Sequence, residues 1–593
     1  MIVDPGTDQA SPPTTPPQPA AATRQPAGNR VVPWVFWPAA VVVLGLSVFA
    51  MVFPTSASTF FGAAQSAVVA AFSWYYVLIA AFFVVFALFV GFSRFGDIKL
   101  GRDEEEPEFS AGAWFALLFA AGMGIGLVFY GASEPLSHYV TPPPGRGGGT
   151  APEQALASLA QTYLHWGLHA WSIYVVVGLA LAYAIHRRGR PVSIRWALEP
   201  LLGRRVHGAW GNGIDALALV GTVFGVATSL GLGVLQIGTG LQAAGAPAPG
   251  NAMNVAIIAV ITAFVLFSVL SGVAKGMKWL SSANLLLAAA LLVYVLVAGP
   301  TQTVLREMVQ SIGVYLQGFV GLSFTVSALQ GPEGEAWQGA WTSFYWGWWM
   351  SWAPFVGVFI ARVSRGRTVR QFVMGVLLVP TLLTVVWFAV VGGTAVISEV
   401  RQPGSMLTAD GSVDLQGALF QLFELLPGTP VLVIGALVLI AVFFVTSADS
   451  GALVMGMIAT GGSTEPARWV RVFFTLATAV LAAALLVAGG SNGLEALQSA
   501  AIMVALPFSV IMLLLCWATV IAFQRERRVY DRAERRQLLA QVGDHYGLEV
   551  ETPNEGGVGV PAWMRRRRPA VPAAPAPDEG DGHGRAGAPE RRA

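Results

Sequence analysis

The chain has 593 residues, of which 55% are hydrophobic and only 11% are charged. Ordinary soluble domains carry about 25% charged residues, so this chain has too little charge to cover a water-exposed surface. The composition excludes a soluble multidomain enzyme, a nucleic-acid-binding protein and a disordered scaffold, because each needs a polar exterior. It indicates an integral membrane protein, and the single cysteine, Cys516, excludes a disulfide within the chain.

Twelve apolar runs divide most of the chain. A bilayer core about 30 Å thick needs about 20 apolar residues per helix, so the runs predict an all-α membrane protein with twelve transmembrane helices. They lie near residues 34–53, 72–93, 112–138, 153–185, 208–243, 253–273, 277–299, 336–362, 368–397, 428–459, 466–490 and 494–523. Residues 1–33, rich in Pro, Ala and Thr, are expected to be a disordered tail. Residues 300–335 are less apolar and are predicted to contain an amphipathic surface helix.

The basic residues test the number of spans independently. With twelve spans, 32 of the 35 Lys and Arg residues fall on the side that holds both termini. The three that fall on the other side are Arg146, Arg306 and Arg401. Positive charge accumulates on the cytoplasmic side of membrane proteins. We therefore expect a multi-pass protein of a bacterial plasma (inner) membrane with both termini in the cytoplasm.

The spans divide into two blocks of five. Residues 112–299 form the first block and residues 336–523 the second, preceded by two peripheral helices in 34–93 and followed by a basic helix and a disordered tail in 524–593. Because each block has an odd number of helices, the second is inverted relative to the first. The expected architecture is a 5+5 inverted repeat.

The first helix of each block is interrupted by small or helix-breaking residues. Gly122, Gly124 and Gly126 interrupt the first, and Gly347 with Pro354 is expected to interrupt the second. Interrupted helices at corresponding places in two repeats indicate the binding site of a secondary transporter. The alternative is that small residues only allow close helix packing.

Aromatic residues crowd two of the predicted helices. Trp166, Trp171 and Tyr174 lie in the fourth span, and Trp348, Trp349 and Trp352 lie in the eighth. Aromatic rings suit a quaternary ammonium group, which has no N–H to donate and is held by cation–π contacts. Tryptophans also gather at membrane interfaces, but Trp171 and Trp349 lie well inside their helices.

These motifs make the chain similar to the betaine/choline/carnitine transporter family, and in particular to its sodium-coupled glycine betaine symporters. The resemblance runs from about Trp34 to Phe523 and rests on five motifs. They are the stretch 120–131 with Glu134–Pro135, residues 165–174, residues 344–355, residues 362–367 and residues 443–450. The resemblance implies a leucine-transporter-like fold with two extra N-terminal helices, alternating access, no enzymatic activity and a homotrimer of independently working subunits.

The resemblance also implies a substrate site for a quaternary ammonium zwitterion. Its aromatic cage corresponds to Trp166, Trp171, Tyr174 and Trp349, with Trp348 and Trp352 along the same pathway. Gly122, Gly124 and Gly126 would bring backbone N–H groups close to the substrate carboxylate. Choline-handling relatives carry Asp at the position of Gly126, so this sequence favours a betaine over choline.

Sodium is the coupling ion that the resemblance implies, and no cofactor is expected. The family's shared sodium site corresponds to Ala120, Met123, Phe443, Thr446 and Ser447, which match at every position. A second sodium site corresponds to Thr222, Val226 and Phe355. Val226 replaces a threonine and has no oxygen in its side chain, so the number of sodium ions, one or two, stays open. Ser229 or Thr228 would be the substitute ligand.

A basic C-terminal helix follows the last span. Its arginines are Arg525, Arg527, Arg528, Arg532, Arg535 and Arg536. In the osmoregulated relatives that this chain resembles, such a helix senses potassium and anionic lipids. The alternative is that the arginines only keep this end in the cytoplasm.

The sequence therefore predicts uptake of glycine betaine or a related compatible solute with sodium. Two alternatives within transport stay open. One is a sodium-independent substrate/product antiporter of the carnitine type, and the other is proton-coupled choline uptake.

Overall fold

The computed structural model describes residues 30–122, 124–271, 274–490 and 493–546. Met123 and nearly all of the predicted N-terminal tail and the predicted C-terminal tail lie outside the described residues. The described part is helical, and its β-structure is limited to an isolated bridge between Lys99 and Thr368. The chain divides into two units, Met1–Arg527 and Arg528–Ala593.

The elements follow one another closely along the chain. In order they are α1 (Pro33–Val52), α2 (Pro54–Phe92), η1 (Arg94–Asp97), α3 (Ala111–Gly122), α4 (Ile125–Val140), α5 (Ala151–Trp166), α6 (Leu168–Ala182), η2 (Tyr183–Arg187), α7 (Ile194–Ala197), α8 (Glu199–Leu202), η3 (Gly203–His207), α9 (Ala209–Ala243), α10 (Asn251–Ser271), α11 (Ala274–Ala298), α12 (Thr301–Ser323), α13 (Gly331–Ala340), α14 (Thr342–Val363), α15 (Val369–Trp387), η4 (Phe388–Gly392), α16 (Gly393–Arg401), α17 (Ala418–Glu424), α18 (Thr429–Ala459), α19 (Arg468–Gly489) and α20 (Gly493–Tyr546).

Every predicted span has a helical counterpart, and ten of the described helical segments are long and apolar enough to cross a membrane. Two predicted spans are not among the ten. The span at 112–138 is divided into two helices of 12 and 16 residues, α3 and α4, each too short by itself. The span at 336–362 is α13 with the aromatic-rich α14. The count of twelve therefore stays a prediction.

The first of the two expected interruptions is present. α3 ends at Gly122 and α4 begins at Ile125, with Gly124 in an extended conformation between them. An extended residue leaves the first N–H groups of α4 without partners inside the helix. The glycine run thus opens the backbone where the sequence predicts it.

The second expected interruption was placed wrongly. α14 runs without a break through Gly347 and Pro354, and the chain breaks six residues before Gly347, at Trp341 between α13 and α14. Gly347 serves packing instead, since a Cβ there would lie 2.9 Å from the Cα of Ile502 in α20. The small side chain lets two helices approach closely.

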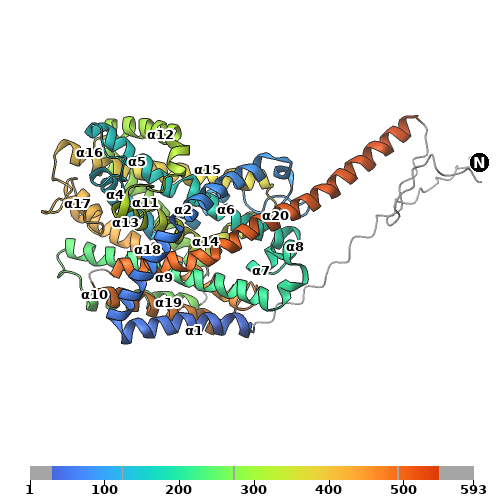
Figure 1. Ribbon diagram of the computed structural model, residues 1–593, viewed down its shortest axis with the longest axis horizontal. Helices are drawn as coiled ribbons and strands as arrows, with labels where there is room; N and C mark the ends of the chain where they lie inside the picture. The colour runs from blue at the N-terminus through green and yellow to red at the C-terminus, as the bar shows by residue number, and fades with distance from the viewer. Residues whose placement is uncertain (1–29, 123, 272–273, 491–492, 547–593) are drawn as a thin grey trace, which may run out of the picture. The chain divides into compact units, whose positions relative to one another are not determined.

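α14 occupies the centre of the first unit. It packs against α6 on one side and α9 on another, and α9 also packs against α18. At the periphery, α1 lies beside α19, while α12 lies beside α5 and α16 (Figure 1). α12 is amphipathic, with one face buried through Val304, Ser311 and Tyr315. The helices that carry the sequence motifs therefore meet in the interior.

α20 joins two predicted segments. The last predicted span and the basic helix after it form one continuous helix of 54 residues. This helix runs past the division between the two units at Arg528. Its side chains at Arg528, Arg532, Arg535 and Arg536 are exposed.

Candidate functional site

An aromatic cluster forms where α5, α6 and α14 meet. The Trp166 ring lies 4.9 Å from Trp349 and 6.2 Å from Trp348, and the Trp348 and Trp349 rings stack at 4.6 Å. Trp352 lies 6.4 Å from each of these two rings. Tyr174 lies 6.3 Å from Trp349. All are buried, so their rings form one water-poor surface, which we call the cage.

Trp171 belongs to the cage only indirectly. Its ring lies 5.4 Å from Tyr174, and no ring contact with α14 is recorded for it among the described residues. Three further rings join the cage that the sequence did not single out as site residues. Tyr130 lies 6.0 Å from Trp166, Tyr345 lies 5.5 Å from it and Phe388 lies 5.2 Å from it.

The indole N–H groups of the cage fall into two pairs. Trp166 donates to Glu134 Oε2 at 2.6 Å, and Trp349 donates to the carbonyl oxygen of His165 at 2.9 Å. In contrast, Trp348 Nε1 and Trp352 Nε1 are buried and have no hydrogen-bond partner in the described part of the chain. Buried donors are normally satisfied. Two N–H groups of the cage are therefore available to a bound acceptor.

The glycine run lies against the cage. Gly124 faces Trp352 and Ser447, at 3.6 Å and 3.8 Å from the position of an added Cβ. At Gly126, a Cβ would overlap the ring of Trp348 and lie 3.0 Å from Trp166. Hydrogen in place of a side chain is thus what allows α4 to begin beside the rings. The first turn of α4, with its free N–H groups and positive dipole end, is adjacent to the cage.

The residues of the predicted shared sodium site come from two parts of the chain, the end of α3 with Met123 and one turn of α18. Phe443, Thr446 and Ser447 lie in one turn of α18, where the Thr446 hydroxyl donates to the carbonyl oxygens of Val442 and Phe443 at 2.9 Å and 3.0 Å. Ser447 faces Gly124. Ala120 and Gly122 lie in the last turn of α3, and Met123 lies outside the described residues. α18 thus places the Ser447 hydroxyl beside Gly124, in the break between α3 and α4, while the full ligand set stays a prediction.

The residues of the doubtful second site lie on two packed helices. Thr222 is buried on α9, and its hydroxyl donates to the Ala218 carbonyl at 2.8 Å. Phe355 is buried on α14, which packs against α9, and its ring lies 5.6 Å from Trp352. A cavity of about 30 Å³ is lined by Val226 together with Ser229, Trp352 and Ser447. The structure thus places Val226 close to the cage. The valine side chain itself supplies no oxygen atom to a sodium ion there.

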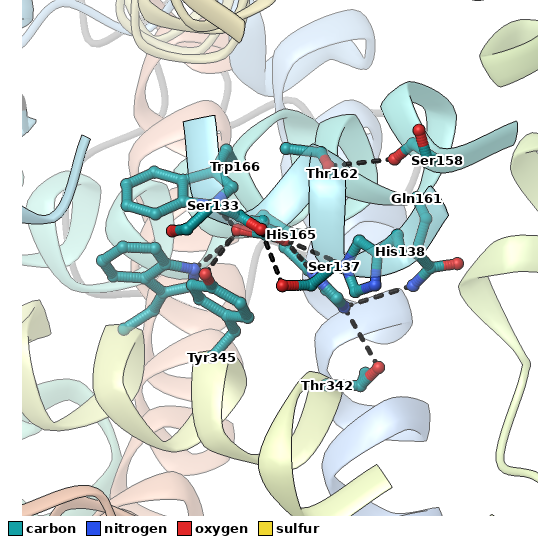
Figure 2. A network of polar contacts seen from close by, with 12 residues as sticks. Ser133, Ser137, His138, Ser158, Gln161, Thr162, His165, Trp166, Thr342 and Tyr345 are labelled. Carbon is teal, nitrogen blue, oxygen red and sulfur yellow. Dashed lines mark hydrogen bonds and ion pairs between the residues drawn. The ribbon is translucent and has the colours of Figure 1, made fainter. Parts of the chain in front are cut away.

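Glu134 is the centre of a polar network beside the cage and was not among the predicted site residues. α4 continues through Glu134 and Pro135, and the carboxyl group is 0% exposed. Oε1 lies 2.7 Å from His165 Nδ1 and 3.3 Å from His138 Nε2. Oε2 accepts from Trp166 and from the Tyr345 hydroxyl. Figure 2 shows the His138, His165, Trp166 and Tyr345 side chains converging on one point.

The two histidines beside the cage, His165 and His169, differ in role. His165 takes part in the Glu134 network, and its other nitrogen lies 3.1 Å from the Thr342 hydroxyl and 3.2 Å from Gln161 Nε2. His169 stacks on Trp346 at 5.4 Å and has no hydrogen-bond partner among the described residues. Glu134, the acidic partner of His165, lies 31 residues before it along the chain. The local sequence around His165 therefore gave no sign of this contact.

The ionisable residue in α18 also has a charged partner. The Asp449 carboxylate lies 3.2 Å from the guanidinium of Arg471 on α19 and also accepts a hydrogen bond from the Ser268 hydroxyl. This ion pair joins the helix of the predicted sodium ligands to its neighbour.

Comparison with known proteins finds one family and several similar chains. Residues 34–528 match the model of the family described as betaine/carnitine/choline family transporter. The chain is 49% identical over 513 residues to an uncharacterized transporter of Mycobacterium tuberculosis, which covers 86% of this chain and 85% of that protein. It is 43% identical over 501 residues to the glycine betaine transporter OpuD of Bacillus subtilis, covering 84% and 96% of the two chains. It is 38% identical over 478 residues to the betaine/ectoine transporter LcoP of Corynebacterium glutamicum, covering 79% and 75%.

Proposed function

We propose, on the premise that this chain belongs to the betaine/carnitine/choline transporter family, that it takes up glycine betaine or a related compatible solute by symport with sodium. The chain is a multi-pass membrane transporter and not an enzyme. The proposal adds the substrate and the coupling ion. Both are argued from the contacts at the cage.

The observation that carries the proposal is the packed cage itself. A trimethylammonium group cannot donate a hydrogen bond, so a site for it needs aromatic faces and no competing water. Each cation–π contact contributes about 0.5–2 kcal/mol, more when it is desolvated. The cage rings Trp166, Trp349 and Tyr174 are buried. The Trp349 ring lies 4.9 Å from Trp166 and 6.3 Å from Tyr174. This arrangement favours an onium group over a primary amine.

A second set of groups suits the carboxylate of a betaine. The N–H groups of Trp348 and Trp352 are buried without partners in the described part of the chain, and the start of α4 lies against the six-membered edges of the same two rings. A carboxylate accepts such bonds readily, whereas choline has only a hydroxyl group. At Gly126 the Trp348 and Trp166 rings leave no room for an aspartate without rearrangement. These contacts favour a zwitterion over choline.

Sodium coupling is supported by the turn of α18 that faces the broken helix. Sodium is a hard cation that binds oxygen atoms, and unwound backbone beside hydroxyl groups supplies them. Ser447 provides a hydroxyl group beside Gly124 in the break, and Thr446 provides a second one in the same turn of α18. A carnitine-type antiporter would need neither group. We propose one sodium ion at this site and leave the second site, with Val226, as an addition to be tested.

The proposal extends to the assembly. It includes twelve spans, the 5+5 inverted repeat, alternating access, a homotrimer and a place in a bacterial plasma membrane with cytoplasmic termini. The exposed arginines of α20 would bind anionic lipids and regulate uptake under osmotic stress, each contributing about 1 kcal/mol near such a surface.

The test is uptake of radiolabelled glycine betaine into proteoliposomes. We expect uptake to require an inward sodium gradient and Trp349→Leu to reduce it at least about tenfold, as the loss of about 1.4 kcal/mol of binding implies. Trp210→Leu is the matched control, because Trp210 is 68% exposed whereas the cage rings are buried. Equal uptake in potassium and sodium would reject symport and favour exchange or proton coupling.

A further inference from the structure

The hydrogen bonds around Glu134 identify it as a carboxylate. Trp166 Nε1 can only donate, and it does so to Oε2. The Nε2 of Gln161 is an amide nitrogen that can only donate, so His165 Nε2, 3.2 Å away, is the accepting nitrogen of a neutral ring. His165 Nδ1 therefore carries the proton and donates it to Glu134 Oε1 at 2.7 Å. Each oxygen atom thus accepts from a defined donor.

This carboxylate has no cation beside it. In the described part of the chain, its ion-pair contacts are with His138 and His165 alone. His138 Nδ1 is buried without a partner among the described residues. A neutral ring that donates from Nε2 leaves only a lone pair unused there, whereas a cationic ring would leave a buried N–H unsatisfied. The network therefore carries a net negative charge.

An uncompensated charge inside a membrane helix bundle is costly, and such residues usually serve function. The two cage rings nearest to Glu134 connect its charge to the substrate position. Trp166 and Tyr345 donate to Oε2 while their rings lie 5.5 Å apart in the cage. Donation to an anion makes a ring more electron-rich, which strengthens its attraction to a cation on its face.

We infer that Glu134 is the counter-charge for the substrate's onium group and that it determines the selectivity of the cage for a cation over a neutral group of the same shape. It touches the cage rings and acts through them, so it is a positioning residue. The inference rests on the proposed function, because it takes the cage to be the onium site.

A divalent metal ion is the competing ligand. Ligand atoms of Glu134, His138 and His165 all lie within 4.8 Å of one another. However, a metal would displace the His165 proton from Oε1, and Oε2 already accepts two bonds. The geometry therefore favours the hydrogen-bonded carboxylate.

The experiment compares two ligands that differ only in charge. Glycine betaine and 3,3-dimethylbutanoate have the same shape and the same carboxylate, but carbon replaces the quaternary nitrogen in the second. Dissociation constants for both are measured by tryptophan fluorescence on the full-length protein in detergent. The quantity tested is the ratio of the two constants, which we call the charge selectivity.

We expect Glu134→Gln to weaken glycine betaine at least about tenfold and the carbon analogue less than about twofold, so that charge selectivity falls. Glu134→Asp keeps the charge and should restore charge selectivity to within about threefold of the wild type. Glu307→Gln is the matched control, because Glu307 is a buried carboxyl group on α12 outside the cage, and it should leave charge selectivity unchanged. Chelation with EDTA should also leave it unchanged.

Three outcomes would overturn the inference. Equal weakening of both ligands by Glu134→Gln would show a structural role only, and loss of charge selectivity in EDTA would assign a metal instead. If Glu134→Gln does not fold, Tyr345→Phe removes one donor but keeps the charge. Because the inference has Glu134 act through Tyr345, unchanged charge selectivity in that variant would then overturn it. Failure of the wild type to bind glycine betaine would reject the proposed function instead.

Discussion

Two glycines illustrate how single hydrogen atoms set the shape of the cage. Gly124 and Gly126 let the start of α4 lie against Trp352, Trp348 and Trp166. Neither glycine has a positive φ that would require it for backbone reasons. Their role is to let the backbone of α4 lie close to the tryptophan rings. The sequence suggests such packing, but only the contacts in the folded protein identify the rings involved.

Gly126→Ala should therefore impair substrate binding without unfolding the protein. A Cβ at this position would overlap the Trp348 ring, and overpacking of this kind costs about 1–3 kcal/mol. We expect the KM for glycine betaine to rise about tenfold or more. Gly112→Ala is the control, since a Cβ there meets nothing within 4 Å. An unchanged KM for Gly126→Ala would show that the rings move aside freely.

Glu307 should make stability depend on pH. It lies on α12, outside the membrane-spanning helices, and burial raises the pKa of its carboxyl group to about 8. Its Oε2 has no hydrogen-bond partner in the described part of the chain. In the unfolded chain its pKa is about 4.3. Between these values the folded protein holds the proton and the unfolded chain does not, so stability falls as pH rises from about 4.3 to 8.

We expect this loss to reach roughly 2–4 kcal/mol by pH 8 and Glu307→Gln to remove it. Thermal unfolding in detergent between pH 5 and 8.5 measures the effect, with the exposed Glu424→Gln as control. The wild type should lose thermal stability across this range while Glu307→Gln keeps it. Parallel curves for the two proteins would contradict the prediction.

At the scale of the elements, the division of one span into α3 and α4 joins the cage to the predicted ion site. The glycine run announces this division, because three glycines in five residues cannot sustain a stable helix. No comparable run of glycines in the sequence marks the break at Trp341. Gly347 and Pro354 led us to predict a break at a place where α14 is continuous. Proline and glycine permit a break, but the packing of α14 against α20 keeps the helix continuous there.

Ser447→Ala tests the link between the broken helix and sodium. Loss of one oxygen ligand costs about 1–3 kcal/mol, so we expect the sodium concentration for half-maximal uptake to rise about tenfold. Maximal uptake at saturating sodium should stay near the wild-type value. Ser47→Ala on α1 is the control: Ser47 is buried, and its hydroxyl donates to the Val43 carbonyl at 2.8 Å. Unaltered sodium dependence in Ser447→Ala would place the ion elsewhere.

For the whole molecule, the apolar runs were sufficient to locate the long helices, because a membrane protein must satisfy its backbone within each helix. The cage was also accessible to the sequence, since its tryptophans cluster within two helices. The Glu134 network was not. Glu134, His165 and Tyr345 lie on three helices, and only the packing of α4, α5 and α14 brings them together. Contacts of this kind depend on helix rotation, which the sequence pattern does not determine.

The boundary between the two units allows the proposed transport and regulation to be separated. Just before Arg528, Glu526 accepts from the Tyr183 hydroxyl at 2.9 Å and pairs with Arg187 at 2.5 Å, both within the first unit. A chain that ends after Arg527 keeps these contacts and loses the exposed arginines. We expect it to keep sodium-dependent uptake within about twofold but to lose the increase in uptake at high osmolality.

Glu526→Gln in the full chain should show the opposite behaviour. Its partner Arg187 is largely buried, and breaking a buried charge pair costs about 3–5 kcal/mol at most, less where solvent reaches it. We therefore expect a lower thermal unfolding temperature with osmotic activation retained. Uptake by proteoliposomes across a range of external osmolality, together with thermal unfolding, measures both variants. If the shortened chain is still activated, the osmotic sensor lies within the first unit, because the arginines beyond Arg527 are then dispensable.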